Sequence, residues 1–327
     1  MLLVLGLALS AVAGAHVDPV SGHTVNNFFN AHTLFQMATD ASAFAIMGVG
    51  ATLVIISGGI DLSVGAVYAI SGVSMALTLR AIGPINPFAT VAVGLAVCLG
   101  VALLCGLLNG LMVVGLGVHS FIITLGTMWV FRGIAFVMSH AESILVPTPL
   151  TSVAKASLGL GESLSPVPLL AMLAVAAIGA VYLARTVMGR HVYAVGGNAE
   201  ASRFSGLRVR RIQLGVFLWS SLTAGLAAFI GAGFYGSATS SDGTGYELYV
   251  IAAAVVGGAS LLGGKGTAWG AMLGAILIVV IRQAIRTLHL DQNYEWIIIG
   301  SALIIAVVLD QSSSRLLARR LARTTSG

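Results

Sequence analysis

The sequence predicts an all-α protein, a polytopic bundle of about ten transmembrane helices. Of its 327 residues 57% are hydrophobic and only 8% are Asp, Glu, Lys or Arg, whereas a soluble domain carries about 25% charged residues. Glycine supplies 41 residues, as suits membrane helices whose backbones pack closely. The apolar runs are continuous and do not alternate with polar residues, which favours helices over a membrane barrel. These observations exclude a soluble globular protein.

The charged residues divide the chain into segments that match the roughly 20 residues needed to cross a bilayer. The first apolar segment has no basic residues before it, which favours a retained helix over a signal peptide. Asp61 alone separates the second from the third, and no charge lies between Arg80 and Arg132, where the fourth and fifth lie. The sixth and seventh fill the next uncharged gaps, the eighth is short and interrupted by glycine, and two more follow. The expected segments are 2–15, 42–60, 63–80, 88–114, 119–138, 167–184, 213–235, 248–262, 267–285 and 295–310.

Two basic windows predict the orientation of these segments. The stretch 185–211 holds six arginines against one acid, and the tail 311–327 holds four arginines and no acid. Basic residues in short loops stay on the cytoplasmic side, and an even number of segments separates the two windows. We therefore expect the loop 186–212, the tail and both termini in the cytoplasm, and the loops 16–40 and 140–166 outside.

A carboxylate inside apolar sequence marks the first candidate site. Asp61 follows the pair Gly58 and Gly59 and precedes Ser63. A charge at membrane depth is costly unless it faces a cavity or a partner, so Asp61 is a candidate transport residue. It could equally cap the helix that follows, and both interpretations stay open, because broken helices often line transport pathways.

A second glycine-rich stretch, 257–266, resembles a phosphate-binding loop but lacks its pattern. Ala259 stands where the motif needs glycine, and Gly266 stands where it needs Ser or Thr after Lys265. Nothing else in the sequence fits the motif, so any ATP hydrolysis must belong to another polypeptide. The pairs Gly257–Gly258 and Gly263–Gly264 indicate a helix break with close packing.

The cytoplasmic window contains a predicted short helix. Asn198 suits an N-cap, Glu200 suits the first turn, and Gly206 can end the helix. A plain loop has no need for a capped helix that carries Phe204, so this piece could dock into a partner protein. On the residues alone, docking and a plain loop are equally supported.

The remaining polar residues carry weaker signals. Within the apolar segments Asn109 and Thr124 could hydrogen-bond a hydroxylated solute, but such groups more often join helices; Arg132 is a further polar residue there. The histidines show no metal-ligand spacing and no catalytic motif is present, so an enzyme is not indicated. The basic balance is explained by topology, and nucleic-acid binding is not expected.

Together these motifs resemble a known family. The chain is similar to the integral-membrane permease subunit of bacterial ABC importers for simple sugars, the ribose-permease type. The blocks that carry the likeness are 52–65 (TLVIISGGIDLSVG), 106–110 (GLLNG), 121–127 (FIITLGT) with 132–133, 193–201 (YAVGGNAEA) with 205–206, 246–248 (YEL), 251–253 (IAA), 257–261 (GGASL) and 263–264.

The resemblance implies a single permease domain that pairs with a second copy or a paralogue in the bacterial inner membrane. It implies a cytoplasmic ABC ATPase that holds ATP and Mg, a periplasmic or lipid-tethered sugar-binding protein, and no cofactor on this chain. The implied ATPase-coupling residues are Asn198, Glu200, Ala201, Arg203, Phe204 and Gly206. The pathway candidates are Asp61, Ser63, Asn109 and Thr124, and the helix-break glycines are Gly58, Gly59, Gly257, Gly258, Gly263 and Gly264. The alternative function is a stand-alone ion-coupled secondary transporter that relies on Asp61.

Overall fold

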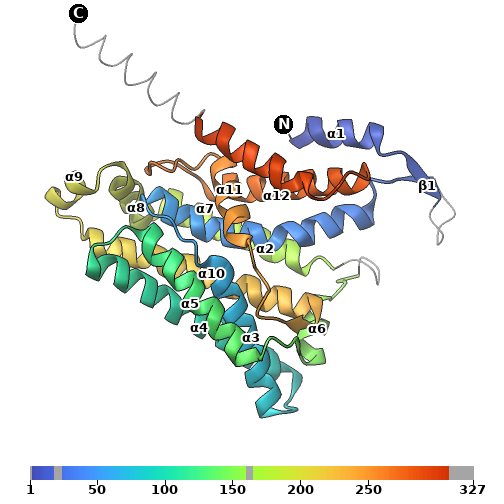
Figure 1. Ribbon diagram of the computed structural model, residues 1–327, viewed down its shortest axis with the longest axis horizontal. Helices are drawn as coiled ribbons and strands as arrows, with labels where there is room; N and C mark the ends of the chain where they lie inside the picture. The colour runs from blue at the N-terminus through green and yellow to red at the C-terminus, as the bar shows by residue number, and fades with distance from the viewer. Residues whose placement is uncertain (1, 18–23, 160–164, 309–327) are drawn as a thin grey trace, which may run out of the picture.

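A computed structural model describes residues 2–17, 24–159 and 165–308 (Figure 1). Within this part of the chain, seven helices are long and apolar enough to cross a membrane. They are α2 (Ala31–Ile56), α3 (Val64–Ile82), α4 (Pro87–Leu116), α5 (Ser120–Ser139), α7 (Val167–Arg185), α10 (Val209–Tyr235) and α12 (Ala268–Thr287).

Three shorter apolar helices account for the other predicted segments. They are α1 (Leu2–Val12), α11 (Tyr246–Val256) and the helix Tyr294–Val308. Each of the ten predicted segments therefore contains a helix, and the all-α, polytopic prediction is confirmed. The remaining elements are small: β1 (Ala15–Val17) pairs with β2 (Thr24–Asn26), β3 (Ile144–Leu145) pairs with β4 (Ser237–Ala238), and α6 (Thr148–Ala154), α8 (Val187–Gly197) and α9 (Ala199–Phe204) are short helices.

α2 lies at the centre of the bundle. It packs against α7, α10, α11 and α12, and its apolar side chains, such as Ile46, Met47 and Leu53, are fully buried. α5 instead lies at the edge, against α3 and α4, and exposes large apolar side chains, among them Ile122 and Trp129. Apolar side chains thus lie both in the core of the bundle and on the outer surface of an edge helix, as expected for a protein surrounded by lipid.

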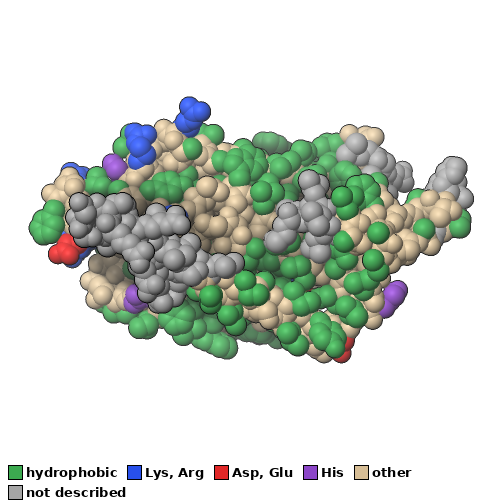
Figure 2. Space-filling model, turned by 90° about the horizontal axis from the view of Figure 1, so that it is seen from above, with side chains coloured by type: hydrophobic (Ala, Val, Ile, Leu, Met, Phe, Trp, Pro, Cys, Tyr) green, Lys and Arg blue, Asp and Glu red, His purple; other side chains and the backbone are tan. Residues whose placement is uncertain are grey.

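The connections gather at two opposite ends. α8 and α9 lie at one end, and α6 with the paired strands β3 and β4 lies at the other (Figure 1). On the face seen in Figure 2, hydrophobic side chains cover the middle, and Lys and Arg gather at the α9 end. This arrangement fits the prediction that the loops 186–212 and 140–166 lie on opposite sides of a bilayer; the tail 311–327 lies outside the described residues.

Several predicted boundaries were wrong because hydropathy misses polar turns of a helix. α2 begins at Ala31 and not at residue 42, because Asn30 caps it by accepting a hydrogen bond from the Thr33 amide (2.8 Å). α10 already begins at Val209, among arginines. The predicted loops 140–166 and 186–212 also hold the helices α6 and α8, which have too few apolar residues to be recognised as spans.

Two non-helical segments interrupt the bundle. The first break, residues 57–63, joins α2 to α3, and the second break, residues 236–245, joins α10 to α11. α11 has 11 residues, about 16 Å of helix, and cannot cross a hydrocarbon core of about 30 Å alone. The second break meets the first turn of α3 at two glycines, since a Cβ on Gly65 would lie 2.3 Å from the Gly243 carbonyl oxygen.

Candidate functional site

The first break runs beside α5 and uses its hydroxyl groups. Gly58 adopts a φ of +85°, which ends α2 in a conformation that favours glycine. The amide of Ile60 then donates to Ser120 Oγ (2.9 Å), and that of Leu62 donates to Thr124 Oγ1 (3.1 Å). Backbone donors at membrane depth need such partners because lipid offers none. Thr124, a pathway candidate, therefore stabilises the break.

Asp61 is the centre of a buried polar network. Its Oδ1 accepts hydrogen bonds from the Ser63 amide (2.9 Å) and hydroxyl (2.6 Å), and its Oδ2 accepts one from Ser220 Oγ on α10 (2.8 Å). Asn109 on α4 donates to Ser63 Oγ (2.7 Å). None of these four side chains is more than 2% exposed. The network therefore joins the first break to α4 and α10.

The structure thus brings all four pathway candidates to one place, around the first break. The residue that caps α3 is Ser63, without a side-chain capping bond, and Asp61 instead bonds the amide that precedes the helix. Its carboxylate oxygens are both occupied by protein donors. In this conformation the network joins helices. This is one of the two roles that the sequence left open for these residues, the other being contact with the transported solute.

The predicted coupling helix is present as α9. Asn198 Oδ1 accepts from the Ala201 amide (2.8 Å), Glu200 lies in the first turn, and Gly206 follows with a φ of +85°. Ser202 is buried against the bundle, whereas Phe204 is 84% exposed. A six-residue helix with a large apolar side chain in solvent has the form of a docking element.

A hollow of about 420 Å³ lies between α9 and the first break. Arg203 and Arg210 border it on one side, and Gly58, Gly59 and the α4–α5 turn border it on the other. Neither arginine forms an ion pair within the described residues. A movement of α9 would therefore change the space directly beside the first break.

Glycines join α8 to the end of α2 and to the stretch 257–266. Gly263 and Gly264 adopt positive φ angles, and the Gly264 amide donates to the Ile56 carbonyl (2.8 Å). A Cβ on Gly196 would lie 1.6 Å from that carbonyl oxygen and 2.6 Å from the Gly264 nitrogen. Three backbones thus touch without side chains between them. We call Gly196, Ile56 and Gly264 the glycine junction.

Two further contacts support the junction. Tyr193 on α8 donates its hydroxyl to the Gly266 carbonyl (2.7 Å), and burial raises the pKa of this phenol, which keeps the donor protonated. Gly257 ends α11 and packs on α12, where a Cβ would lie 2.1 Å from the Gly270 carbonyl oxygen. The predicted segment 248–262 is therefore not a broken span: its helix ends at Val256, and the glycines form the turn beyond it.

The second break carries charged residues that the sequence did not connect. Arg132 of α5 donates through Nη1 to the carbonyls of Ser240 (2.8 Å) and Asp242, and Glu247 lies close enough to interact with its charge. More than 100 residues separate Arg132 from its partners, so no local spacing indicated them. The available signals were an arginine inside an apolar segment, Arg132, and acidic residues just before the next apolar segment, Asp242 and Glu247. Within the described residues no three His, Cys, Asp or Glu side chains gather as metal ligands.

Comparison with known proteins assigns the family. Residues 33–308 match the model described as branched-chain amino acid transport system / permease component. The chain belongs to this permease family. The match runs from α2 to the helix Tyr294–Val308 and so includes both breaks, α9 and the glycine junction. No solved structure matches the chain.

Among the permease's relatives are three proteins named for sugar transport. The D-allose transport system permease protein of Escherichia coli K12 is 36% identical over 290 residues, 88% of this chain and 86% of its own length. The ribose import permease protein of the same strain is 36% identical over 285 residues, 87% of each chain. The fructose import permease protein of Rhizobium meliloti is 32% identical over 290 residues, 87% of this chain and 79% of its own.

Proposed function

We propose that this chain is the membrane-spanning permease subunit of an ATP-driven importer of a simple sugar. The observation that carries the proposal is its likeness, over most of both chains, to permeases named for allose, ribose and fructose. The likeness favours this function over an ion-coupled secondary transporter. The two oxygens of Asp61, on which ion coupling would depend, are also taken up by Ser63 and Ser220.

The chain itself is a transporter subunit and not an enzyme. ATP and Mg belong to a separate cytoplasmic ATPase, since the stretch 257–266 lacks the phosphate-binding pattern. This ATPase docks on α9, whose exposed Phe204 fits an apolar groove, with Glu200 and Arg203 beside it. The loop 186–212 is thus the coupling loop, and the α9 end of the bundle and both termini face the cytoplasm of a bacterial cell.

Coupling passes from α9 to the breaks along two routes. The hollow beside Arg203 leads to Gly58 and Gly59, and the glycine junction joins α8 to the ends of α2 and α11. Because backbones touch at the junction, a shift of α8 cannot be absorbed by side chains. ATP-driven movement of the coupling loop would therefore bias the arrangement of the bundle.

A second permease copy or a paralogue covers the face that both breaks share. Both segments lie with α5 on the viewer's side of Figure 1, and each contains exposed residues, Gly58 in the first break and Ser241 and Thr244 in the second. Non-helical backbone at membrane depth is tolerated only against protein or a water-filled path. We call this surface the open face and place the translocation path along it, with Asp61, Ser63, Asn109 and Thr124 holding the first break in shape.

The uptake direction requires a binding protein outside the cell that delivers the sugar. A path with few net charges suits a neutral, hydroxylated solute better than an ionic one. The relatives' names cover different sugars, so the solute of this chain is assigned only as a simple sugar.

The experiment is to tag the C-terminus, purify the chain gently from its native membrane and identify what accompanies it. A stoichiometric ATPase with a phosphate-binding loop is expected, and the double variant Glu200→Ala/Arg203→Ala should weaken its retention and its ATP-driven uptake. The exposed Glu142 on the opposite end supplies the control variant Glu142→Gln. Recovery of the chain alone, active in vesicles with only an ion gradient, would refute the proposal.

A further inference from the structure

Arg132 lies well inside the length of α5 and so at membrane depth. It is the thirteenth residue of α5, so about 18 Å of helix separates it from the α9 end and about 10 Å from the other end. An ionisable residue at this depth is by default a functional candidate. Like Glu247, it is partly exposed, whereas Asp61 is fully enclosed.

Asp242 has a structural task at the second break. Its carboxylate accepts from the Thr239 amide (2.8 Å) and the Thr239 hydroxyl (2.7 Å), which closes the turn. Arg132 fixes the same turn through Nη1, by its bonds to the carbonyls of Ser240 and Asp242. Its remaining N–H groups have no protein acceptor within the described residues. The guanidinium is therefore held in place by Nη1, and its other N–H groups can donate to a ligand.

The Glu247 carboxylate interacts with the backbone amides of Gly245 and Glu247 and with the charge of Arg132, but one of its oxygens is unpartnered. Its Oε2 is buried without a hydrogen bond, and it lies against Gly65, where a Cβ would be 2.7 Å from this oxygen. Burying a carboxylate oxygen without a hydrogen-bond donor costs more free energy than burying an unpaired neutral acceptor. Arg132 interacts with this carboxylate through its charge, but no hydrogen bond joins them. A donor from outside the chain would satisfy this oxygen.

The positions of Arg132 and Glu247 indicate which chemical group could supply that hydrogen bond. Glu247 lies in the first turn of α11, near the place where Gly65 of α3 meets Gly243 of the second break, and the neighbouring Ser241 and Thr244 are exposed. Arg132 interacts with the charges of both Glu247 and Asp242, and the Asp242 carboxylate is occupied by Thr239, which leaves Glu247 as the acceptor. A carboxylate acceptor beside a fixed guanidinium donor matches two adjacent hydroxyl groups, one donating and one accepting.

We propose that Arg132 and Glu247 contact vicinal hydroxyl groups of the translocated sugar and determine which sugars pass the permease. This inference rests on the proposed function and adds a substrate contact to it. It assigns the solute contact to the second break, whereas the Asp61 network holds the first break. When the open face parts to admit solute, the free Glu247 oxygen gains its donor.

The test uses the permease with its ATPase in liposomes and a saturating concentration of its loaded binding protein. Under saturation the maximal uptake rate reports the permease and not the affinity of the binding protein. The probes are D-ribose and 2-deoxy-D-ribose, which differ in one hydroxyl of a vicinal pair. Because a hydrogen bond to a charged group is lost, we expect the wild-type ratio of maximal rates to favour ribose by about tenfold.

Glu247→Gln and Arg132→Lys should bring that ratio close to one, while Glu142→Gln leaves it unchanged. Basal ATP hydrolysis verifies that each variant is assembled. If Glu247→Gln does not assemble, Glu247→Asp, which keeps the charge but shortens the reach, should still reduce the ratio. Equal losses for both sugars at an unchanged ratio would overturn the inference. A wild-type permease that imports neither these sugars nor D-allose or D-fructose with ATP would instead overturn the proposed function.

Discussion

The glycine junction supplies a sharp test with a matched control in the next residue. In Gly196→Ala the new methyl group would lie 1.6 Å from the Ile56 carbonyl oxygen and 2.6 Å from the Gly264 nitrogen. Both obstacles are backbone atoms, so no side chain can rotate away. In Gly197→Ala the methyl group meets nothing within 4 Å, and the two variants differ in chemistry by nothing else.

The expected loss of unfolding free energy in Gly196→Ala follows from the backbone atoms that must move. Forcing a methyl group into a packed interior costs about 1–3 kcal/mol. Moving α8 away from the end of α2 and from the turn at Gly264 also breaks the hydrogen bond from the Gly264 amide to the Ile56 carbonyl. A buried polar group left without a partner costs about 1–3 kcal/mol more. We therefore expect Gly196→Ala to lose about 2–6 kcal/mol of unfolding free energy, a large part of a typical 5–15 kcal/mol.

The assay is thermal unfolding of the purified permease in lipid nanodiscs, with ATP-driven uptake measured in parallel. Gly196→Ala should unfold at a clearly lower temperature and lose uptake, whereas Gly197→Ala should match or slightly exceed the wild type, because alanine favours a helix. Equal unfolding temperatures for the two variants would show that these backbones do not touch, and the route from α8 to the breaks would be wrong.

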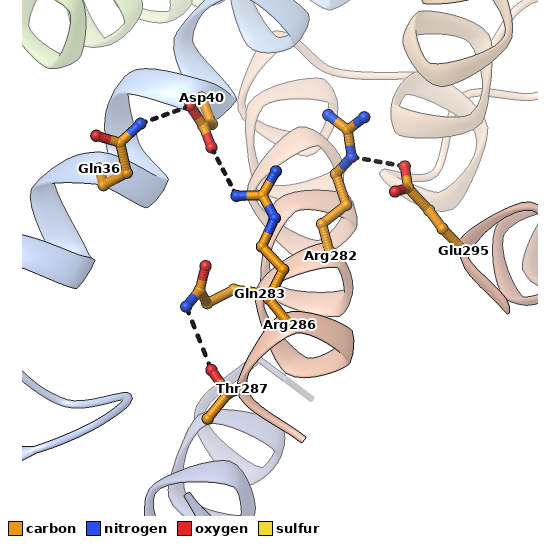
Figure 3. A network of polar contacts seen from close by, with 7 residues as sticks. All are labelled: Gln36, Asp40, Arg282, Gln283, Arg286, Thr287 and Glu295. Atoms are coloured by element: carbon orange, nitrogen blue, oxygen red, sulfur yellow. Dashed lines mark hydrogen bonds and ion pairs between the residues drawn. The ribbon is translucent and has the colours of Figure 1, made fainter. Parts of the chain in front are cut away.

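Three further predictions concern other elements. Asn198→Ala removes the cap of α9 and should destabilise that helix by about 0.5–2 kcal/mol; ATPase retention should fall, whereas Asn198→Asp, which keeps the acceptor, should restore it. Asp61→Ala deletes the acceptor of three hydrogen bonds and should lower the unfolding temperature; an unchanged unfolding temperature together with the loss of a gradient-driven uptake seen in the wild type would contradict a structural role. Arg282 pairs with Glu295 (Figure 3) and also lies against the rings of Phe44 and Tyr249. It should show a coupling energy of about 1–3 kcal/mol with Glu295 in a double-mutant cycle; no coupling would mean that the pair does not hold the helix Tyr294–Val308.

The sequence predicted those features that depend on the residues of one helix alone. Charge-free runs located every apolar helix, because each must match the bilayer by itself. Asn198 and Gly206 likewise placed α9 within a residue, because caps act locally. The polar start of α2 was missed because His32, Gln36 and Asp40 lower the hydropathy of turns that Asn30 nonetheless caps.

What the sequence could not reveal depends on pairs that are distant along the chain. Ser220 gave no sign that it binds Asp61, and Gly196 gave none that it touches Ile56. For the same reason Glu247 was read only as part of a motif, although its unpaired oxygen makes it a candidate contact. Residue type indicated which side chains were costly in lipid, but only the packing shows which of them are already satisfied.

The open face has a consequence for how the permease is made. A newly inserted chain would expose the polar, non-helical backbone around Ser241 and Thr244 to hydrocarbon, an environment that offers it no hydrogen bonds. Under the proposed pairing, an unpaired subunit is unstable in the membrane, and its lifetime depends on how quickly it binds the second permease subunit. Cells that make one subunit in excess should clear the surplus by proteolysis, so the abundance of the complex is set during assembly.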